Sequence, residues 1–83
     1  MKHEGRGAAR LHDKTDHGGD VITATGPMLM GLPAALAGDM THCPRCNGNF
    51  AITPDGVGAR HLGRAYAYAG DLTACGARLV ASV

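Results

Sequence analysis

The sequence predicts a small all-β domain of short strands and hairpins arranged with pseudo-threefold symmetry. One template occurs three times, at residues 5–17, 31–43 and 63–75, which we call the first, second and third repeats. Each begins with a glycine, has an aspartate eight residues later and a threonine two residues after that, and ends in a histidine or cysteine. Thirteen glycines imply frequent tight turns, and no window shows the apolar period of an α-helix. A chain of 83 residues built in this way is expected to wrap around an approximate threefold axis.

Short apolar runs bounded by turn residues are expected to supply the strands, at residues 21–23, 28–30, 34–37, 50–53, 65–69 and 78–82. The stretch 28–37 is apolar enough to suggest a helix, but Gly31 and Pro33 interrupt it. Hairpin reversals are expected at residues 31–33 and 62–64, and a further turn at Asp55 and Gly56.

One strand is expected to leave each repeat, which makes Ile22, Ile52 and Leu79 equivalent positions. Counted in this way, the second repeat is followed by an insertion of about four residues that contains residues 44–46. The aspartate of each repeat is expected to accept backbone N–H bonds in an Asx-type turn. These aspartates are Asp13, Asp39 and Asp71.

Length and composition indicate a single domain, residues 1–83, in which we expect residues 1–4 to be disordered. A chain of this size leaves much of its surface in water, so its core alone gives marginal stability. Tryptophan is absent, and the aromatic residues are only Phe50, Tyr66 and Tyr68. The fold is therefore expected to need an additional link.

Net charge and hydrophobicity exclude several classes of function. Eight basic and seven acidic residues leave a net charge of +1 without a basic stripe, which argues against nucleic acid as a partner. The N-terminal segment lacks the apolar region of a signal peptide, and no stretch reaches the roughly 20 apolar residues that span a bilayer. We therefore expect a protein made in the cytoplasm without a signal peptide or stable membrane anchoring.

The last position of each repeat holds a residue that can bind a metal, namely His17, Cys43 and Cys75. Threefold symmetry would bring these residues together near the axis, and Cys46, in the sequence C-P-R-C, is placed to add a fourth ligand. Thiolate and imidazole ligands suit Zn²⁺, and four protein ligands make a closed structural site without a position for a catalytic water. Such a site contributes on the order of 10 kcal/mol or more near neutral pH.

Some alternatives stay open at this level. The cysteines alone would also fit buried small side chains or a redox pair, although an odd number in a reducing compartment disfavours a disulfide framework. His42 is adjacent to Cys43 and could replace Cys43 or Cys46 as a ligand. The remaining histidines are expected to be solvated, hydrogen-bonded or in strands: His3, His12 and His61.

No group of residues indicates catalysis. The sequence G-x-S-x-G is absent, Ser82 is the only serine, and the carboxylates belong to turns rather than to an adjacent pair. We therefore expect that the protein is not an enzyme.

The sequence resembles a known family, the PAAR-repeat proteins, which are small zinc-bound cones that cap the spike of bacterial type VI secretion systems. The resemblance rests on T-D-H-G-G at 15–19, G-L-P-A-A-L-A-G-D at 31–39, C-P-R-C at 43–46 and the segment 63–82. The Pro-Ala-Ala-Arg of the family appears here as Pro-Ala-Ala-Leu at 33–36 and Gly-Ala-Ala-Arg at 7–10. Members can bind the metal through three histidines and one cysteine, whereas this chain has three cysteines in suitable places.

The resemblance implies a conical domain with Zn²⁺ near its tip and a wide base that caps a trimeric VgrG-type spike, one chain per trimer. It implies a mechanical role in membrane puncture and effector delivery, with the protein exported at the tip of the spike. Any effector would be a separate protein, because the chain stops about eight residues after Cys75.

Two rival interpretations fit the sequence less well. A zinc-ribbon-like module that binds protein or nucleic acid would explain the ligands but not the threefold register of glycine, alanine and aspartate. A thiol oxidoreductase using Cys43 and Cys46 would require a βαβ context that the sequence does not suggest.

Overall fold

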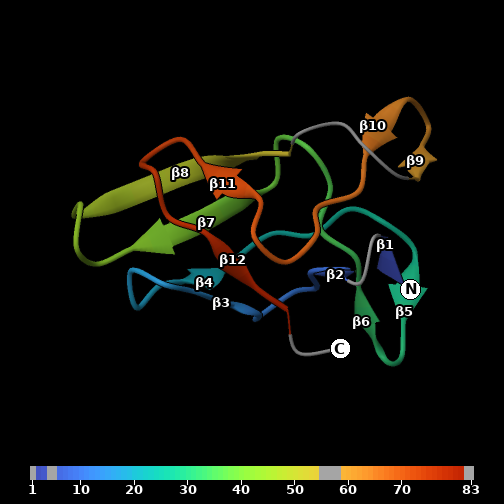
Figure 1. Ribbon diagram of the computed structural model, residues 1–83, viewed down its shortest axis with the longest axis horizontal. Helices are drawn as coiled ribbons and strands as arrows, with labels where there is room; N and C mark the ends of the chain where they lie inside the picture. The colour runs from blue at the N-terminus through green and yellow to red at the C-terminus, as the bar shows by residue number, and fades with distance from the viewer. Residues whose placement is uncertain (1, 4–5, 55–58, 82–83) are drawn as a thin grey trace.

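The computed structural model describes residues 2–3, 6–54 and 59–81, and within these ranges it contains strands and turns but no helix (Figure 1). The all-β prediction is therefore confirmed. The strands are β1 (Lys2–His3), β2 (Arg6–Gly7), β3 (Lys14–Thr15), β4 (Asp20–Val21), β5 (Met28–Leu29), β6 (Leu32–Pro33), β7 (Met40–Cys43), β8 (Gly48–Thr53), β9 (Arg60–His61), β10 (Arg64–Ala65), β11 (Leu72–Thr73) and β12 (Leu79–Val80).

Six of these strands form one antiparallel sheet in the order β11-β8-β7-β4-β3-β12. A bridge between Leu72 of β11 and Arg78, next to β12, brings the two edges of the sheet together, so the sheet is nearly a closed barrel. The other strands form three separate hairpins, β1-β2, β5-β6 and β9-β10. These hairpins spread across one end of the long axis, and the turns β3-β4 and β7-β8 lie at the other end (Figure 1). Closing the sheet leaves few unpaired strand edges.

The pseudo-threefold symmetry is visible in a closed ring of backbone hydrogen bonds. The amide of Ala9 donates to the carbonyl of Ala67 (2.9 Å), that of Ala67 to Ala35 (3.0 Å) and that of Ala35 to Ala9 (2.9 Å). The three alanines are the equivalent fifth residues of the three repeats, and each is fully buried. A larger side chain would not allow three backbones to approach one axis so closely, which explains alanine at this position.

The hydrophobic core repeats the same symmetry. The ring of Ala9, Ala35 and Ala67 packs against a second ring formed by Val21, Ile52 and Leu79. A second cluster, nearer the hairpins, uses the fourth and sixth residues of the repeats and is less symmetric: Ala8, Ala34, Leu36, Tyr66 and Tyr68. The two tyrosines thus supply much of the bulk that the alanines lack.

The three template aspartates are buried and make equivalent contacts. In each repeat the Oδ2 atom accepts the backbone N–H three residues earlier, at 2.8 Å in all three cases. The prediction that these side chains accept backbone N–H bonds is confirmed, but the direction is backwards along the chain and the motif is not an Asx turn. The residue before each aspartate has a positive φ, as in a tight turn: His12 (73°), Gly38 (87°) and Gly70 (90°).

One predicted equivalence was wrong by a single residue. Val21 rather than Ile22 corresponds to Ile52 and Leu79, because its amide bonds to the carbonyl of Asp13 as theirs bond to Asp39 and Asp71. Val21 is fully buried and Ile22 is 39% exposed, as expected when a shift of one residue turns a strand to its other face. With Val21 four residues after His17 and Ile52 nine after Cys43, the insertion is five residues long rather than about four.

The hairpin reversals also differ from the prediction. The residues with positive φ are Met30 (50°) with Gly31 (94°), and Leu62 (51°) with Gly63 (82°). The first turn therefore starts one residue earlier than expected, and the second is one residue shorter. Two successive positive φ values define the two-residue turn that matches the twist of a hairpin. The predicted turn at residues 55–56 lies outside the described residues.

Other strand boundaries were predicted only in part. Residues 34–37 make isolated bridges rather than a continuous strand, and β3, β7 and β11 were not anticipated from their polar composition. Lys2 and His3, expected to be disordered, form β1; Met1 and Glu4 lie outside the described residues.

Candidate metal centre

The metal-capable residues of the repeats lie at or beside the turns β3-β4, β7-β8 and β11-β12. His17 follows β3, Cys43 is the last residue of β7, and Cys75 follows β11. Cys46 lies in the turn between β7 and β8, within the five-residue insertion. Because the six-stranded sheet nearly closes, these turns converge at the end of the molecule opposite the hairpins β5-β6 and β9-β10 (Figure 1).

The four side chains form one compact cluster. The ligand atoms of His17, Cys43, Cys46 and Cys75 all lie within 4.8 Å of one another. His17 Nδ1 is 3.6 Å from Cys43 Sγ and 3.9 Å from Cys75 Sγ. In a tetrahedron with metal–sulfur bonds of about 2.3 Å and metal–nitrogen bonds of about 2.0–2.1 Å, sulfur and nitrogen are about 3.6 Å apart. The observed spacing therefore fits a four-coordinate metal ion.

Backbone and hydroxyl donors surround the sulfur atoms. The amide of Cys46 points to Cys43 Sγ at 3.4 Å, as expected when a C-x-x-C turn curls around one sulfur atom. The hydroxyl of Thr73 lies 3.2 Å from Cys75 Sγ. These contacts hold two of the sulfur atoms in place within the cluster.

The surroundings shift the pKa values of two of the thiols in opposite directions. The hydrogen bond from Thr73 lowers the pKa of the Cys75 thiol to about 6. The neighbouring Cys43 thiol and partial desolvation raise the pKa of Cys46 to about 11. Several thiolates cannot be charged side by side without a cation between them, so the donor set has the chemistry of a site for a divalent metal ion.

A glycine allows the strands beneath the cluster to approach one another. A Cβ atom at Gly19 would overlap the carbonyl oxygen of His42, on the neighbouring strand β7. The amide of Gly19 donates to the hydroxyl of Thr15 at 3.1 Å. Gly19 thus permits the close contact that holds the turn of His17 against the strand of Cys43.

The other histidines do not join the cluster. His42 points away from Cys43, because neighbouring residues in a strand point to opposite faces. It is exposed, and its Nδ1 lies 3.1 Å from Asn49 Oδ1. His12 is exposed at its positive-φ position, and His61 lies in β9. The side chain of His3 is outside the described part of the structure.

The fold and the cluster together define a small all-β domain with internal threefold symmetry and, among the described residues, one Cys/His cluster that could hold a metal ion. The family profile described as PAAR motif matches residues 11–81, which is most of the chain, so the protein belongs to the PAAR-motif family. This family is defined by a structural motif rather than by an enzymatic activity, and it is generally associated with the tip of the type VI secretion spike. No curated protein matches the chain.

The described residues contain no helix long and apolar enough to cross a membrane.

Proposed function

We propose that this protein is the tip of a type VI secretion spike and caps a trimeric VgrG-type protein, one chain per trimer. The observation that carries the proposal is the closed ring of hydrogen bonds among Ala9, Ala35 and Ala67, which gives a single chain approximate threefold symmetry. A monomer of this kind can present three similar surfaces to the three subunits of a cyclic trimer around a shared axis. An asymmetric monomer could contact only one subunit in each manner.

The end of the molecule that carries the hairpins β5-β6 and β9-β10 supplies a suitable contact surface. Met30 and Leu62, at the turns of hairpins β5-β6 and β9-β10, are 81% and 90% exposed. Both occupy positive-φ positions that favour glycine or asparagine, so neither side chain is explained by the needs of the turn. Exposed apolar residues at equivalent places indicate a surface that is covered in a complex. Docking there would also cover the strand ends of the trimer.

The opposite end would act as the point. We propose that His17, Cys43, Cys46 and Cys75 bind one Zn²⁺ there, with no contribution from His42. Zinc suits this donor set because thiolate and imidazole match its borderline softness and four protein ligands close its coordination sphere. The ion would link all three repeats, and the resulting rigid point would puncture the target envelope when the spike is driven outward.

Several further proposals follow from the same role. The protein is made in the cytoplasm, leaves the cell on the spike and assists the delivery of effectors. It performs no catalysis, and the net charge of +1 does not favour nucleic acid as a partner.

The direct test mixes the purified chain with the VgrG-type trimer from the same genome and measures the mass of the complex by size exclusion with light scattering. We expect one chain per trimer. The double variant Met30→Asp, Leu62→Asp should bind at least tenfold more weakly at unchanged metal content. Ile22→Asp is the matched control, because Ile22 is an exposed apolar residue outside these hairpins, and it should bind as the parent does.

Two results would contradict the proposal. Failure of the parent chain to bind any VgrG-type trimer of that genome would favour an independent zinc-ribbon-like module. A stoichiometry of three chains per trimer would show that the internal symmetry is not matched to the spike.

A further inference from the structure

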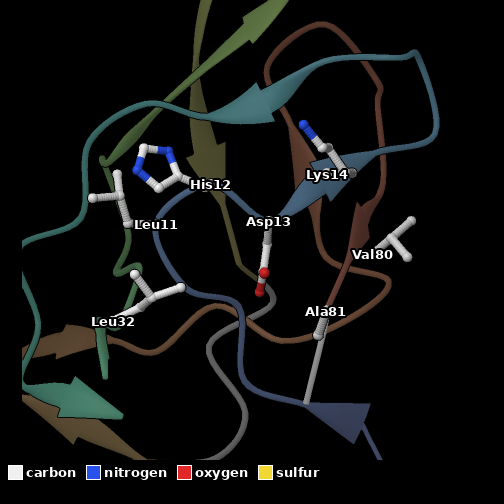
Figure 2. Close-up of a pocket in the computed structure, with 7 residues that line it drawn as sticks. All are labelled: Leu11, His12, Asp13, Lys14, Leu32, Val80 and Ala81. Carbon is white, nitrogen blue, oxygen red and sulfur yellow. The ribbon is translucent and has the colours of Figure 1, made fainter. Parts of the chain in front are cut away.

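A groove of about 400 Å³ lies on the side of the domain, lined by residues 11–14, Leu32 of β6 and residues 80–81 at the end of β12 (Figure 2). Its walls are mostly apolar, with Leu11 and Leu32 on one side and Val80 and Ala81 on the other. The carboxyl group of Asp13 points between them, while Lys14 extends away from it (Figure 2). The groove has no role in the proposed function.

The threefold symmetry shows what belongs in such a groove. Residues 37–40 of the second repeat correspond to residues 11–14 of the first, and Arg64 of the third repeat corresponds to Leu32 of the second. At this second location Arg64 covers the surface. Its Nε and Nη2 atoms donate to the carbonyl oxygen of Ala37 at 3.0 and 2.7 Å.

The guanidinium of Arg64 also lies beside the buried aspartate of that repeat. Its Nη2 atom is 3.6 Å from Asp39 Oδ1. Asp39 accepts the amides of Leu36 and Thr25 at the same time, at 2.8 and 3.0 Å. An aspartate in this position can therefore satisfy nearby backbone amides and a guanidinium together, since a carboxylate offers about four lone-pair sites.

The groove of the first repeat has equivalent acceptor groups, but a leucine stands at the position of the arginine. Leu11 and Asp13 correspond to Ala37 and Asp39, but Leu32 stands where the third repeat has Arg64. Within the described residues no hydrogen bond is made to the carbonyl oxygen of Leu11. The first repeat itself carries Arg6 at this position, so leucine in the second repeat is the exception among the three.

We propose that this groove binds an arginine side chain presented by a partner polypeptide. The guanidinium donates to the carbonyl oxygen of Leu11 and lies beside Asp13, as Arg64 does with Ala37 and Asp39. Its methylene groups cover the apolar walls formed by Leu32 and Val80, because a long basic side chain buries its stem along apolar surface.

Arginine is favoured over lysine by geometry. Arg64 places two donors of its planar guanidinium on a single carbonyl oxygen, which a lysine ammonium cannot reproduce with the same orientation. The surroundings also limit the partner segment. Lys14, beside the groove, would repel a highly basic segment, so we expect a single arginine flanked by neutral or acidic residues.

The binding test uses the whole chain in its metal-bound form and N-acetyl-arginine amide as the probe, followed by amide chemical shifts in NMR. We expect saturable shifts at residues 11–14, Leu32 and Val80, with a dissociation constant in the millimolar range. N-acetyl-citrulline amide has nearly the same shape without the charge and should bind at least fivefold more weakly. Equal shifts with both probes, or no saturable shift at the groove, would overturn the proposal.

The variant Leu32→Arg supplies the missing side chain from within the protein. It should weaken binding of the probe at least tenfold and raise the melting temperature, because the new arginine occupies the groove as Arg64 occupies its counterpart. Leu32→Met is the control that keeps an apolar side chain of similar size, and it should bind the probe as the parent does. Unchanged binding by a folded Leu32→Arg variant would refute the proposed position of the guanidinium.

Discussion

The buried aspartates of the repeats are predicted to stabilise the fold through hydrogen bonds rather than through charge, and Asp39 offers the clearest test. Asp39 is 3% exposed. Its Oδ2 atom accepts the buried amide of Leu36 at 2.8 Å and the partly buried amide of Thr25 at 3.0 Å. Its Oδ1 atom lies 3.2 Å from the Thr25 hydroxyl and 3.6 Å from Arg64 Nη2.

The substitution Asp39→Ala leaves the amide of Leu36 without an acceptor, at a cost of about 1–3 kcal/mol for a buried group. The loss at the partly buried amide of Thr25 adds about 1 kcal/mol. The total of roughly 2–4 kcal/mol is a large part of the 5–15 kcal/mol that stabilises a typical domain. At about 4–8 °C per kcal/mol for a chain of this size, we expect the melting temperature to fall by roughly 8–32 °C.

The comparison with Asp39→Asn separates hydrogen bonding from charge. The amide oxygen of asparagine can take the place of Oδ2 and keep both backbone bonds, while its NH₂ group faces Arg64. We therefore expect a loss of only about 1 kcal/mol.

The assay is thermal and urea unfolding of the metal-bound protein, followed by circular dichroism. Asp20→Ala serves as the control, because Asp20 in β4 is an aspartate that is only half-buried. The free energy of unfolding should change there by no more than about 0.5 kcal/mol. If Asp39→Ala were as stable as that control, or Asp39→Asn as unstable as Asp39→Ala, the hydrogen-bond explanation would be refuted.

Metal analysis of the parent should find one zinc per chain, and Cys75→Ser should lower both this ratio and the melting temperature; unchanged zinc in that variant would remove Cys75 from the site. In protein treated with a chelator, alkylation of Cys75 should be half-maximal near pH 6 and level off by about pH 8, because a lowered pKa of about 6 leaves the reactive thiolate present at neutral pH. Cys46, with a pKa raised to about 11, should still gain reactivity as the pH rises to 10, and the reverse order by mass spectrometry would contradict the assigned contacts. Gly19→Ala should cost roughly 2 kcal/mol or more and weaken metal binding, because its methyl group would force β4 away from the carbonyl of His42; a stability equal to that of the parent would show that the strands separate freely.

Much of the structure was predictable because its symmetry follows from a sequence template that occurs three times. The repeated order of alanine, aspartate, threonine and ligand predicts three equivalent units, and equivalent units around one axis bring His17, Cys43 and Cys75 together. That the aspartates accept backbone N–H bonds was also predictable, since the residue type and its spacing recur. The helix at 28–37 was correctly rejected, because Gly31 and Pro33 act on the backbone at their own positions.

Other features depend on contacts between repeats and could not be read locally. Val21 and Ile22 are both apolar, and only the pairing of β4 with β7 decides which one enters the core. The same holds for the strands β3, β7 and β11, whose polar residues are held in extended form by their neighbours rather than by their own propensity.

The sequence by itself therefore determined the all-β class, the threefold repetition and the residues that form the His/Cys cluster, because each of these follows from residue types in a fixed spacing. The tertiary structure alone decided how the cluster is held and where the symmetry is broken. The approach of Gly19 to His42 and the groove beside Leu32 both join segments whose relative position is set by closure of the sheet. Closure is a property of the whole chain, since it requires the first and third repeats to meet through β3 and β12.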